Sequence, residues 1–294
     1  MDTRILSRQP ISKGWSSDQK FKLEFVDGRF GLLRMAELTS LEDKRSEFSL
    51  MQKLAAKGCP ISQPLDFWTD TSYVYSVFEW IDGQDMVDVA AVLSDQELYD
   101  LGRQAGMFLR TLHSLPIDQA ERDWNTFYQA KIDKKIAAYQ ASEHSYKSGQ
   151  LMIDFIQANR HLLSQRPIAH HHGDFHTGNF LLGEDRHLKI LDFDRHDIGD
   201  PWEEFNRIIF TASLSSAFAC GQIDSYFEEN IPKEFWTLLA LYLTVNSLGA
   251  LSWAEKVDSA QVPLMKEQAE LLGQWFGGYK KIIPTWYSKM NKKR

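Results

Sequence analysis

Short apolar runs separated by turn residues fill the N-terminal part of the chain and predict a small β-sheet. Residues 20–26 and 30–35 are strand-like, and the Asp-Gly step between them is typical of a tight hairpin turn. Apolar residues at helical spacing predict a helix over residues 40–57. The run at 73–80 is rich in aromatic and β-branched residues, which indicates a buried strand.

Helical spacing dominates the rest of the chain. A helix is predicted from Ser94 to about Ser114, and Ser94 with Glu97 forms the capping-box pattern at its start. The run at 235–245 is the most apolar, but it is too short to span a bilayer, so we interpret it as a buried helix. Further helices are predicted within residues 121–165, 233–253 and 261–282.

Residues 172–194 interrupt this helical pattern with a predicted β-hairpin that has polar ends. Two short apolar runs, 180–182 and 188–191, are separated by a turn-rich connection. Folding such a hairpin brings its two ends together. Asn179 and Asp192, which flank the hairpin, are therefore expected to be neighbours in space.

Asp174 lies five positions before Asn179, in the loop that enters the hairpin. Together with Asp192 these residues offer hard oxygen ligands, which suit Mg²⁺ shared with substrate phosphates. In phosphoryl transfer one carboxylate orients the attacking hydroxyl, while an Asn and an Asp bind the metal. We predict Asp174 as the catalytic residue and Asn179 and Asp192 as Mg²⁺ ligands. The alternative is a hairpin whose polar ends have no function.

The pattern HGDxHxGN, which ends at Asn179, and the LDFD that ends at Asp194 resemble the aminoglycoside phosphotransferase and choline kinase family. The resemblance implies an α+β, two-lobe, protein-kinase-like fold. Its small β-rich nucleotide-binding lobe would cover residues 1–80, and a large, mainly helical catalytic and substrate-binding lobe would cover residues 81–294. In this family His172 would have a structural role beside the catalytic loop, which we favour over a metal site.

The resemblance also implies positions for the nucleotide phosphates. The polar loop that contains Ser16 and Ser17 would cover them, although an ordinary turn explains these residues as well. Arg34 occupies the strand position where the family usually has Lys, and Glu47 in the following helix would pair with it. A solvent-facing arginine and a surface glutamate are the alternatives.

The end of the strand at 73–80 resembles the family's hinge, where backbone groups contact the nucleotide base. The hinge candidates are Glu79, Trp80 and Ile81. Because backbone contacts leave little side-chain signature, ATP and GTP both remain open as co-substrate.

Acidic residues after the hairpin are candidates for binding an amine-bearing substrate: Asp194, Asp197, Glu203 and Glu204. Asp194 stands where the family often has Gly. For the two glutamates, interaction with the positive N-terminus of a predicted helix is a sufficient alternative. The basic C-terminal sequence weakens an assignment to aminoglycosides, whose kinases have an acidic end.

Composition limits the partners and the compartment. The net charge of −7 argues against nucleic acid or an anionic membrane surface as a partner, and is compatible with a cationic small substrate. Only two cysteines occur, Cys59 and Cys220, and the N-terminal sequence has no apolar signal core, which predicts a cytoplasmic protein.

The predicted function is transfer of the γ-phosphate of ATP or GTP to a hydroxyl of a small molecule. An antibiotic, an amino alcohol such as choline, or a sugar would each fit as acceptor. The second function class is a nucleotide-binding pseudokinase or regulator, because Arg34 and Asp194 are unusual at their positions. A protein kinase ranks last, since no Ala-Pro-Glu segment follows Asp192.

Overall fold

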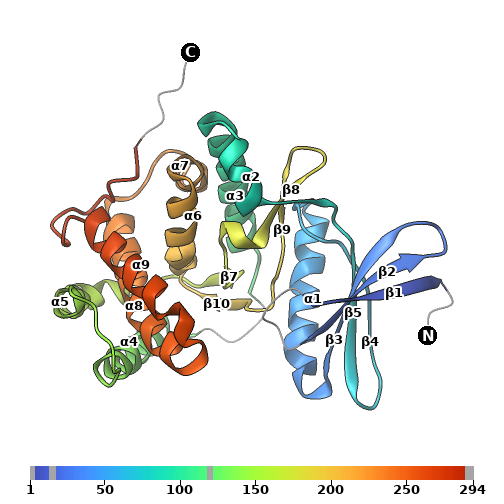
Figure 1. The fold of residues 1–294 in the computed structure, drawn as a ribbon, viewed down its shortest axis with the longest axis horizontal. Coiled ribbons are helices and arrows are strands. Elements are labelled where there is room, and N and C mark those ends of the chain that lie inside the picture. Colours follow the sequence, from blue (N-terminus) through green and yellow to red (C-terminus); the bar gives the residue numbers. More distant parts are fainter. Residues whose placement is uncertain (1–3, 13–17, 118–121, 289–294) are drawn as a thin grey trace. The chain divides into compact units, whose positions relative to one another are not determined.

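The computed structural model describes residues 4–12, 18–117 and 122–288, and the chain divides into two units (Figure 1). Unit 1 takes in residues up to 91 together with 172–174 and 178–196; unit 2 takes in 92–171, 175–177 and the residues from 197 onward. Unit 1 therefore continues past the expected boundary at residue 80 and includes the hairpin, which that boundary assigns to the C-terminal lobe. The division into a nucleotide lobe and a substrate lobe stays a prediction.

Unit 1 contains a five-stranded antiparallel sheet with the order β1-β2-β3-β5-β4. Leu23, Leu33 and Val77 pack together as a buried cluster within it. The strands predicted at 20–26, 30–35 and 73–80 are all present. The strand bounds are β1 (Ile5–Ile11), β2 (Gln19–Phe25), β3 (Phe30–Glu37), β4 (Pro64–Thr69) and β5 (Tyr73–Glu79).

Helix α1 (Leu41–Ala56) packs against β4 and β5 (Figure 1). Its Phe48 ring lies 5.3 Å from the ring of Phe67 and 5.7 Å from that of Phe78, between centroids. Lys44 and Glu47, three positions apart and hence on one face of the helix, are also buried, at 7% and 3% exposure. The helix therefore carries two charged side chains into the interior of unit 1.

The predicted hairpin is confirmed. Strands β8 (Phe180–Gly183) and β9 (Leu188–Ile190) pair antiparallel, with Phe180 opposite Ile190, and β6 (Gly83–Asp85) adds a third strand beside β8. The short helix α2 (Met86–Val89) follows β6. Each strand is short, so the register is set by a few buried residues.

Unit 2 is mainly helical, with one two-stranded ribbon of β7 (Ala169–His171) and β10 (Asp197–Gly199). The capping box predicted at the start of α3 is present. The helices are α3 (Asp95–His113), α4 (Trp124–Gln140), α5 (Gly149–Asn159), α6 (Ile208–Leu214), α7 (Ser216–Tyr226), α8 (Lys233–Val257) and α9 (Val262–Trp275). Short 3₁₀ segments occur in both units, at Leu38–Ser40, Ala90–Val92, Arg160–Leu163, Thr177–Asn179, Glu203–Arg207 and Ser259–Gln261.

The apolar run at 235–245 is the middle of α8, a helix of 25 residues. By length and composition α8 could cross a membrane, but 78% of its most apolar window is buried inside the protein. It contacts α4, α5 and α9, which are helices of the same unit. The interpretation as a buried core helix is confirmed.

A buried carboxylate organises the polar interior of unit 2. Asp200 is fully buried, and Arg166 donates to its two oxygens at 2.6 and 3.1 Å. The Tyr242 hydroxyl donates to Oδ2 at 2.5 Å, and the Trp202 backbone N–H donates to Oδ1 at 2.9 Å. With four donors around it, the charge of Asp200 is compensated despite its burial.

Helices α3 and α7 approach each other with their backbones in contact. A Cβ added to Gly106 of α3 would lie 2.2 Å from the carbonyl oxygen of Gln222 in α7, and one added to Gly221 would lie 2.1 Å from that of Tyr99. These distances are below any real contact, so only glycine permits this crossing.

Replacing Gly106 with Ala is expected to lower the free energy of unfolding by about 1–3 kcal/mol, because the added methyl overpacks the α3–α7 contact. Gly273 in α9 is the matched control, since no atom lies within 4 Å of its added Cβ. Gly273→Ala should instead stabilise by about 0.5–1 kcal/mol through helix propensity. Urea unfolding of both variants measures the difference, and equal effects would contradict the close packing.

Candidate active site

The register of the hairpin places the predicted metal ligands at its open end. The Leu191 N–H donates to the Asn179 carbonyl at 2.9 Å, and Asp192 follows directly. Asp192 has a left-handed backbone, with φ of +64°, a conformation that Asp adopts more readily than most residues. Its Oδ1 accepts the Asp194 N–H at 3.4 Å. Asn179 and Asp192 thus lie at the same end of the hairpin.

Asp174 is connected to this end through the side chain of Asn179. The Asn179 amide Nδ2 donates to the backbone carbonyl of Asp174 at 2.8 Å. Because the NH₂ group is engaged, the carbonyl oxygen Oδ1 is the atom of Asn179 that can bind a cation. The Asp174 side chain is 24% exposed, and the Arg195 Nε lies 4.0 Å from its Oδ2. The structure thus brings Asp174, Asn179 and Asp192 together at the open end of the hairpin.

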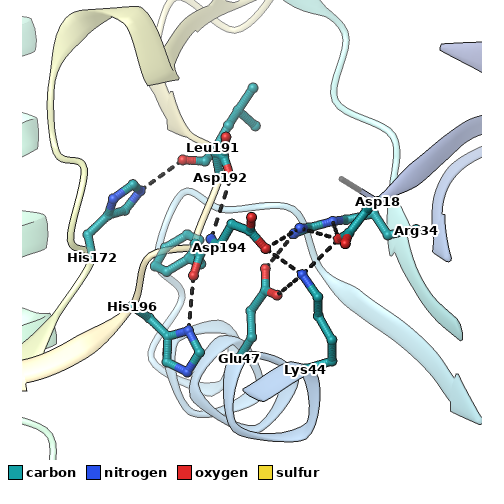
Figure 2. Close-up of polar contacts among 10 residues, drawn as sticks. Asp18, Arg34, Lys44, Glu47, His172, Leu191, Asp192, Asp194 and His196 are labelled. Atoms are coloured by element: carbon teal, nitrogen blue, oxygen red, sulfur yellow. Dashed lines mark hydrogen bonds and ion pairs between the residues drawn. The ribbon is translucent and has the colours of Figure 1, made fainter. Parts of the chain in front are cut away.

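His172 is fully buried and connects the two segments that carry the acidic residues. Its Nδ1 accepts the Asp174 N–H at 3.3 Å. Its Nε2 donates to the Leu191 carbonyl at 2.8 Å, as Figure 2 shows. This combination requires a neutral ring with the proton on Nε2. The ring also contacts Phe193, at 4.5 Å between centroids. This geometry supports the structural role expected for His172.

Gly173 is a site residue that the sequence analysis did not single out. Its φ is +84°, and an added Cβ would lie 1.9 Å from the carbonyl oxygen of Arg195. The loop before Asp174 therefore contacts the segment after Asp192 backbone to backbone. The glycine of the HGD pattern could have indicated this close backbone contact in advance.

Arg34 is buried and makes the predicted pair with Glu47, whose Oε1 accepts from Arg34 Nη1 at 2.6 Å. Arg34 also donates to Asp18 Oδ2 from Nε at 3.1 Å and from Nη2 at 2.7 Å. Nη2 further donates to Asp194 Oδ1 at 2.6 Å. Arg34 is therefore an internal residue of unit 1, and a solvent-facing arginine is excluded.

Lys44 was missed from the sequence, although its position three residues before Glu47 places it on the same helix face. Its Nζ donates to Asp18 Oδ2 at 2.7 Å and to Asp194 Oδ1, and lies 3.7 Å from Glu47 Oε2. Figure 2 shows Lys44 and Glu47 rising from α1 toward Arg34 and Asp194. We call the five residues Asp18, Arg34, Lys44, Glu47 and Asp194 the ion cluster.

Electrostatics keeps Asp194 and the two cations of the ion cluster charged. Burial lowers the pKa of Arg34, but Glu47, Asp18 and Asp194 outweigh burial and raise it overall. Burial and the charge of Arg34 likewise lower the pKa of Lys44, and the carboxylates reverse this. For Asp194 burial raises the pKa, whereas Arg34 and Lys44 lower it to about 2. At neutral pH Asp194, Arg34 and Lys44 are therefore all ionised.

The predicted hinge lies at the end of β5, and much of its backbone is already bonded. Glu79 N–H donates to the Gln63 carbonyl at 2.8 Å, and Trp80 N–H donates to the Phe30 carbonyl at 3.1 Å. Ile81 follows them outside any strand. Their contact with a base stays a prediction. Ser16 and Ser17 lie outside the described residues.

The acidic substrate candidates belong to both units, and Asp194, Asp197 and Glu203 each pair with a cationic residue of the chain. Asp194 is in the ion cluster of unit 1. In unit 2, Arg122 binds both oxygens of Asp197 at 2.9 Å, and Lys131 lies 3.0 Å from Glu203. Glu203 and Glu204 are 7% and 2% exposed. To bind an amine, Asp194, Asp197 or Glu203 would have to release its present cationic partner. The acidic pocket stays a prediction.

Known proteins resemble this chain in sequence and in fold. A family model described as "Phosphotransferase enzyme family" matches residues 7–239. No curated protein gives a significant match. Among solved structures, a thermostable mutant of aminoglycoside phosphotransferase APH(4)-Ia, in a ternary complex with ADP and hygromycin B, is 17% identical with a TM-score of 0.64, and the match covers 91% of this chain and 93% of that one.

Two further structures are similar over nearly their whole length. Amicoumacin kinase hAmiN, in complex with AMP-PNP, Ca²⁺ and Ami, is 13% identical with a TM-score of 0.64, covering 95% of this chain and 90% of that one. A choline/ethanolamine kinase family protein from Mesorhizobium loti is 15% identical with a TM-score of 0.65, covering 96% and 92%. These similarities confirm the predicted α+β, protein-kinase-like fold.

Replacing His172 with Ala is expected to lower the free energy of unfolding by about 2–4 kcal/mol, because it opens a cavity and removes the hydrogen bonds to the Asp174 N–H and the Leu191 carbonyl. His187→Ala, in the exposed connection of the same hairpin, should stay within about 0.5 kcal/mol. Urea unfolding measures both. A His172→Ala protein as stable as the control would show that the two segments do not depend on the imidazole.

Proposed function

Because the chain belongs to the phosphotransferase enzyme family, we propose that it transfers the γ-phosphate of ATP to a hydroxyl of a small molecule. Its class as an enzyme, a phosphotransferase of the kinase type, is confirmed by the family match. The donor nucleotide, the acceptor and the roles of individual residues are the content of the proposal.

The observation that carries the proposal is that three residues, Asp174, Asn179 and Asp192, lie together at one end of the hairpin. Asn179 and Asp192 are placed there by the strand register, and Asp174 is bonded to Asn179 through its backbone carbonyl. The same unit carries the buried pair of Arg34 and Glu47. These are the parts that phosphoryl transfer requires: an orienting carboxylate, metal ligands and a phosphate-binding cation.

Mg²⁺ fits the donor set at the hairpin end. Asn179 Oδ1 and the carboxylate of Asp192 are hard oxygen ligands, and the bond from Asp194 N–H to Asp192 is long at 3.4 Å. Within the described ranges no three His, Cys, Asp or Glu side chains form a metal site of their own. The metal, when bound, would supply positive charge to the phosphates, with water and phosphate oxygens as its other ligands.

The residues of the chain would act mainly by placement and charge. Asp174 would orient the acceptor hydroxyl and take its proton as the oxygen bonds to the γ-phosphorus. The bond from that phosphorus to the β-phosphate oxygen breaks, and ADP leaves with the bonding electrons. Arg34 would neutralise phosphate charge, with Glu47 fixing the guanidinium.

The similar structures favour ATP and a small acceptor. AMP-PNP and ADP are the nucleotides in the amicoumacin kinase and hygromycin B complexes, and both acceptors are small molecules. GTP stays the alternative donor. For the acceptor, an antibiotic, an amino alcohol and a sugar remain the candidate classes. A cytoplasmic location, and partners that include neither nucleic acid nor membrane, also stay predictions. The two cysteines, Cys59 and Cys220, are both buried and form no disulfide.

Asp174→Asn is expected to reduce kcat by about 10²–10⁴-fold and to leave the Kd for ATP unchanged, because the carboxylate acts on the acceptor proton. Asp88→Asn, at an exposed position of α2, is the charge-matched control and should keep full activity. A nucleotide-consumption screen against aminoglycosides, macrolides, choline-like amines and sugars supplies the acceptor. Nucleotide binding without consumption for any acceptor would favour the regulator instead.

Asp192→Asn is expected to raise the Mg²⁺ concentration needed for half-maximal ATP binding by about tenfold or more, since one anionic ligand is lost. Calorimetric titration of ATP at several Mg²⁺ concentrations measures this. Glu184→Gln, in the exposed hairpin connection, should show the wild-type Mg²⁺ dependence. If Asp192→Asn shows that dependence too, Asp192 is not a ligand of the metal.

A further inference from the structure

Lys44 is a buried cation to which the proposed reaction gives no role. Its side chain is 9% exposed, and it lies on α1 rather than on a strand. Burying an ammonium group is unfavourable unless carboxylates compensate it. Asp18 and Asp194 provide that compensation through hydrogen bonds to Nζ. A lysine on the surface would be hydrated and would not require these two carboxylates.

Arg34 and Lys44 direct their donors at the same oxygen atoms. Asp194 Oδ1 accepts from Arg34 Nη2 at 2.6 Å and also from Lys44 Nζ (Figure 2). Two cations that share one acceptor oxygen form the environment in which proteins bind a phosphate oxygen. A carboxylate oxygen of the chain itself occupies that position.

Asp194 differs from the other carboxylates of the ion cluster in its exposure. Its side chain is 28% exposed, whereas those of Asp18 and Glu47 are each 4% exposed. If Asp194 leaves, Arg34 keeps its bonds to Glu47 and Asp18, and Lys44 keeps its bond to Asp18. Two carboxylates then balance two cations, and the donors Nη2 and Nζ become available to an incoming anion.

We infer that Arg34 and Lys44 together bind one phosphate oxygen of the nucleotide, and that Asp194 Oδ1 occupies this position until the nucleotide replaces it. The inference rests on the proposed function, since it assumes a nucleotide as ligand. It assigns Lys44 as a second phosphate-binding cation, supplied by a helix in addition to the strand arginine. It also gives Asp194 a role as an internal competitor of the phosphate.

Metal-free binding of ADP, measured by calorimetry in EDTA, tests the inference on the full chain. Lys44→Met should weaken ADP binding about tenfold or more, equivalent to about 1.4 kcal/mol, because one cation at the phosphate is lost. Arg45→Met is the matched control: Arg45 is the next residue of α1, and its side chain is 60% exposed. It should bind ADP as the wild type does.

Asp194→Asn should strengthen metal-free ADP binding several-fold, because a neutral amide competes less well for the two cations. Adenosine, which has no phosphates, separates a phosphate contact from a structural effect. Its affinity, measured by competition, should be the same for all four proteins. Thermal unfolding checks that each variant is folded.

Each result decides between clear alternatives. If Lys44→Met binds ADP as tightly as Arg45→Met, or loses adenosine and ADP equally, Lys44 does not bind phosphate. If Asp194→Asn binds ADP no more tightly than the wild type, Asp194 does not compete for the site. If the wild-type protein binds neither ADP nor GDP under any metal condition, the proposed function itself fails, together with this inference.

Discussion

The burial of the Arg34 guanidinium is the constraint on which the rest of unit 1 depends. A buried arginine cannot lose its proton, so the surrounding structure must supply carboxylates. Asp18 comes from the segment before β2, Glu47 from α1 and Asp194 from the segment after β9. One charge on β3 thereby connects the sheet, the helix and the loop next to the predicted metal ligands. Replacing Arg34 with a neutral residue would leave the three carboxylates of the ion cluster with one cation, Lys44, in a place with little access to water.

Backbone geometry, more than side-chain chemistry, brings the predicted site residues together. The short β8–β9 hairpin needs only its register to place Asn179 beside the segment that leads to Asp192. His172 then connects that segment to the loop of Asp174, and Gly173 permits the close contact with Arg195. A few main-chain hydrogen bonds and one neutral imidazole thus position groups that would act on a triphosphate. Preorganisation of this kind avoids an energetic cost when substrates bind.

Local patterns in the sequence were sufficient for the hairpin, the strands of the first sheet and the buried α8, whereas the pairing of Arg34 with Glu47 was implied by the resemblance to the family. The first three depend on alternation, helical spacing or a motif of nearby residues. The ion cluster as a whole could not be foreseen, because Lys44 and Asp194 are 150 positions apart and no pattern relates them. Asp194 was expected at an acidic substrate site, and its contacts with two cations depend on tertiary structure alone. The partners of Asp197 and Glu203 in unit 2 escaped prediction for the same reason.

The composition of α8 has a consequence for how the protein is made. By length and composition this 25-residue helix could cross a membrane, and in the fold it packs against α4, α5 and α9. During synthesis α4 and α5 emerge before α8, whereas α9 emerges after it. Until α9 has emerged, the part of α8 that α9 contacts stays exposed. At this stage aggregation or capture by a chaperone competes with folding. A chain interrupted between α8 and α9 would remain in that state.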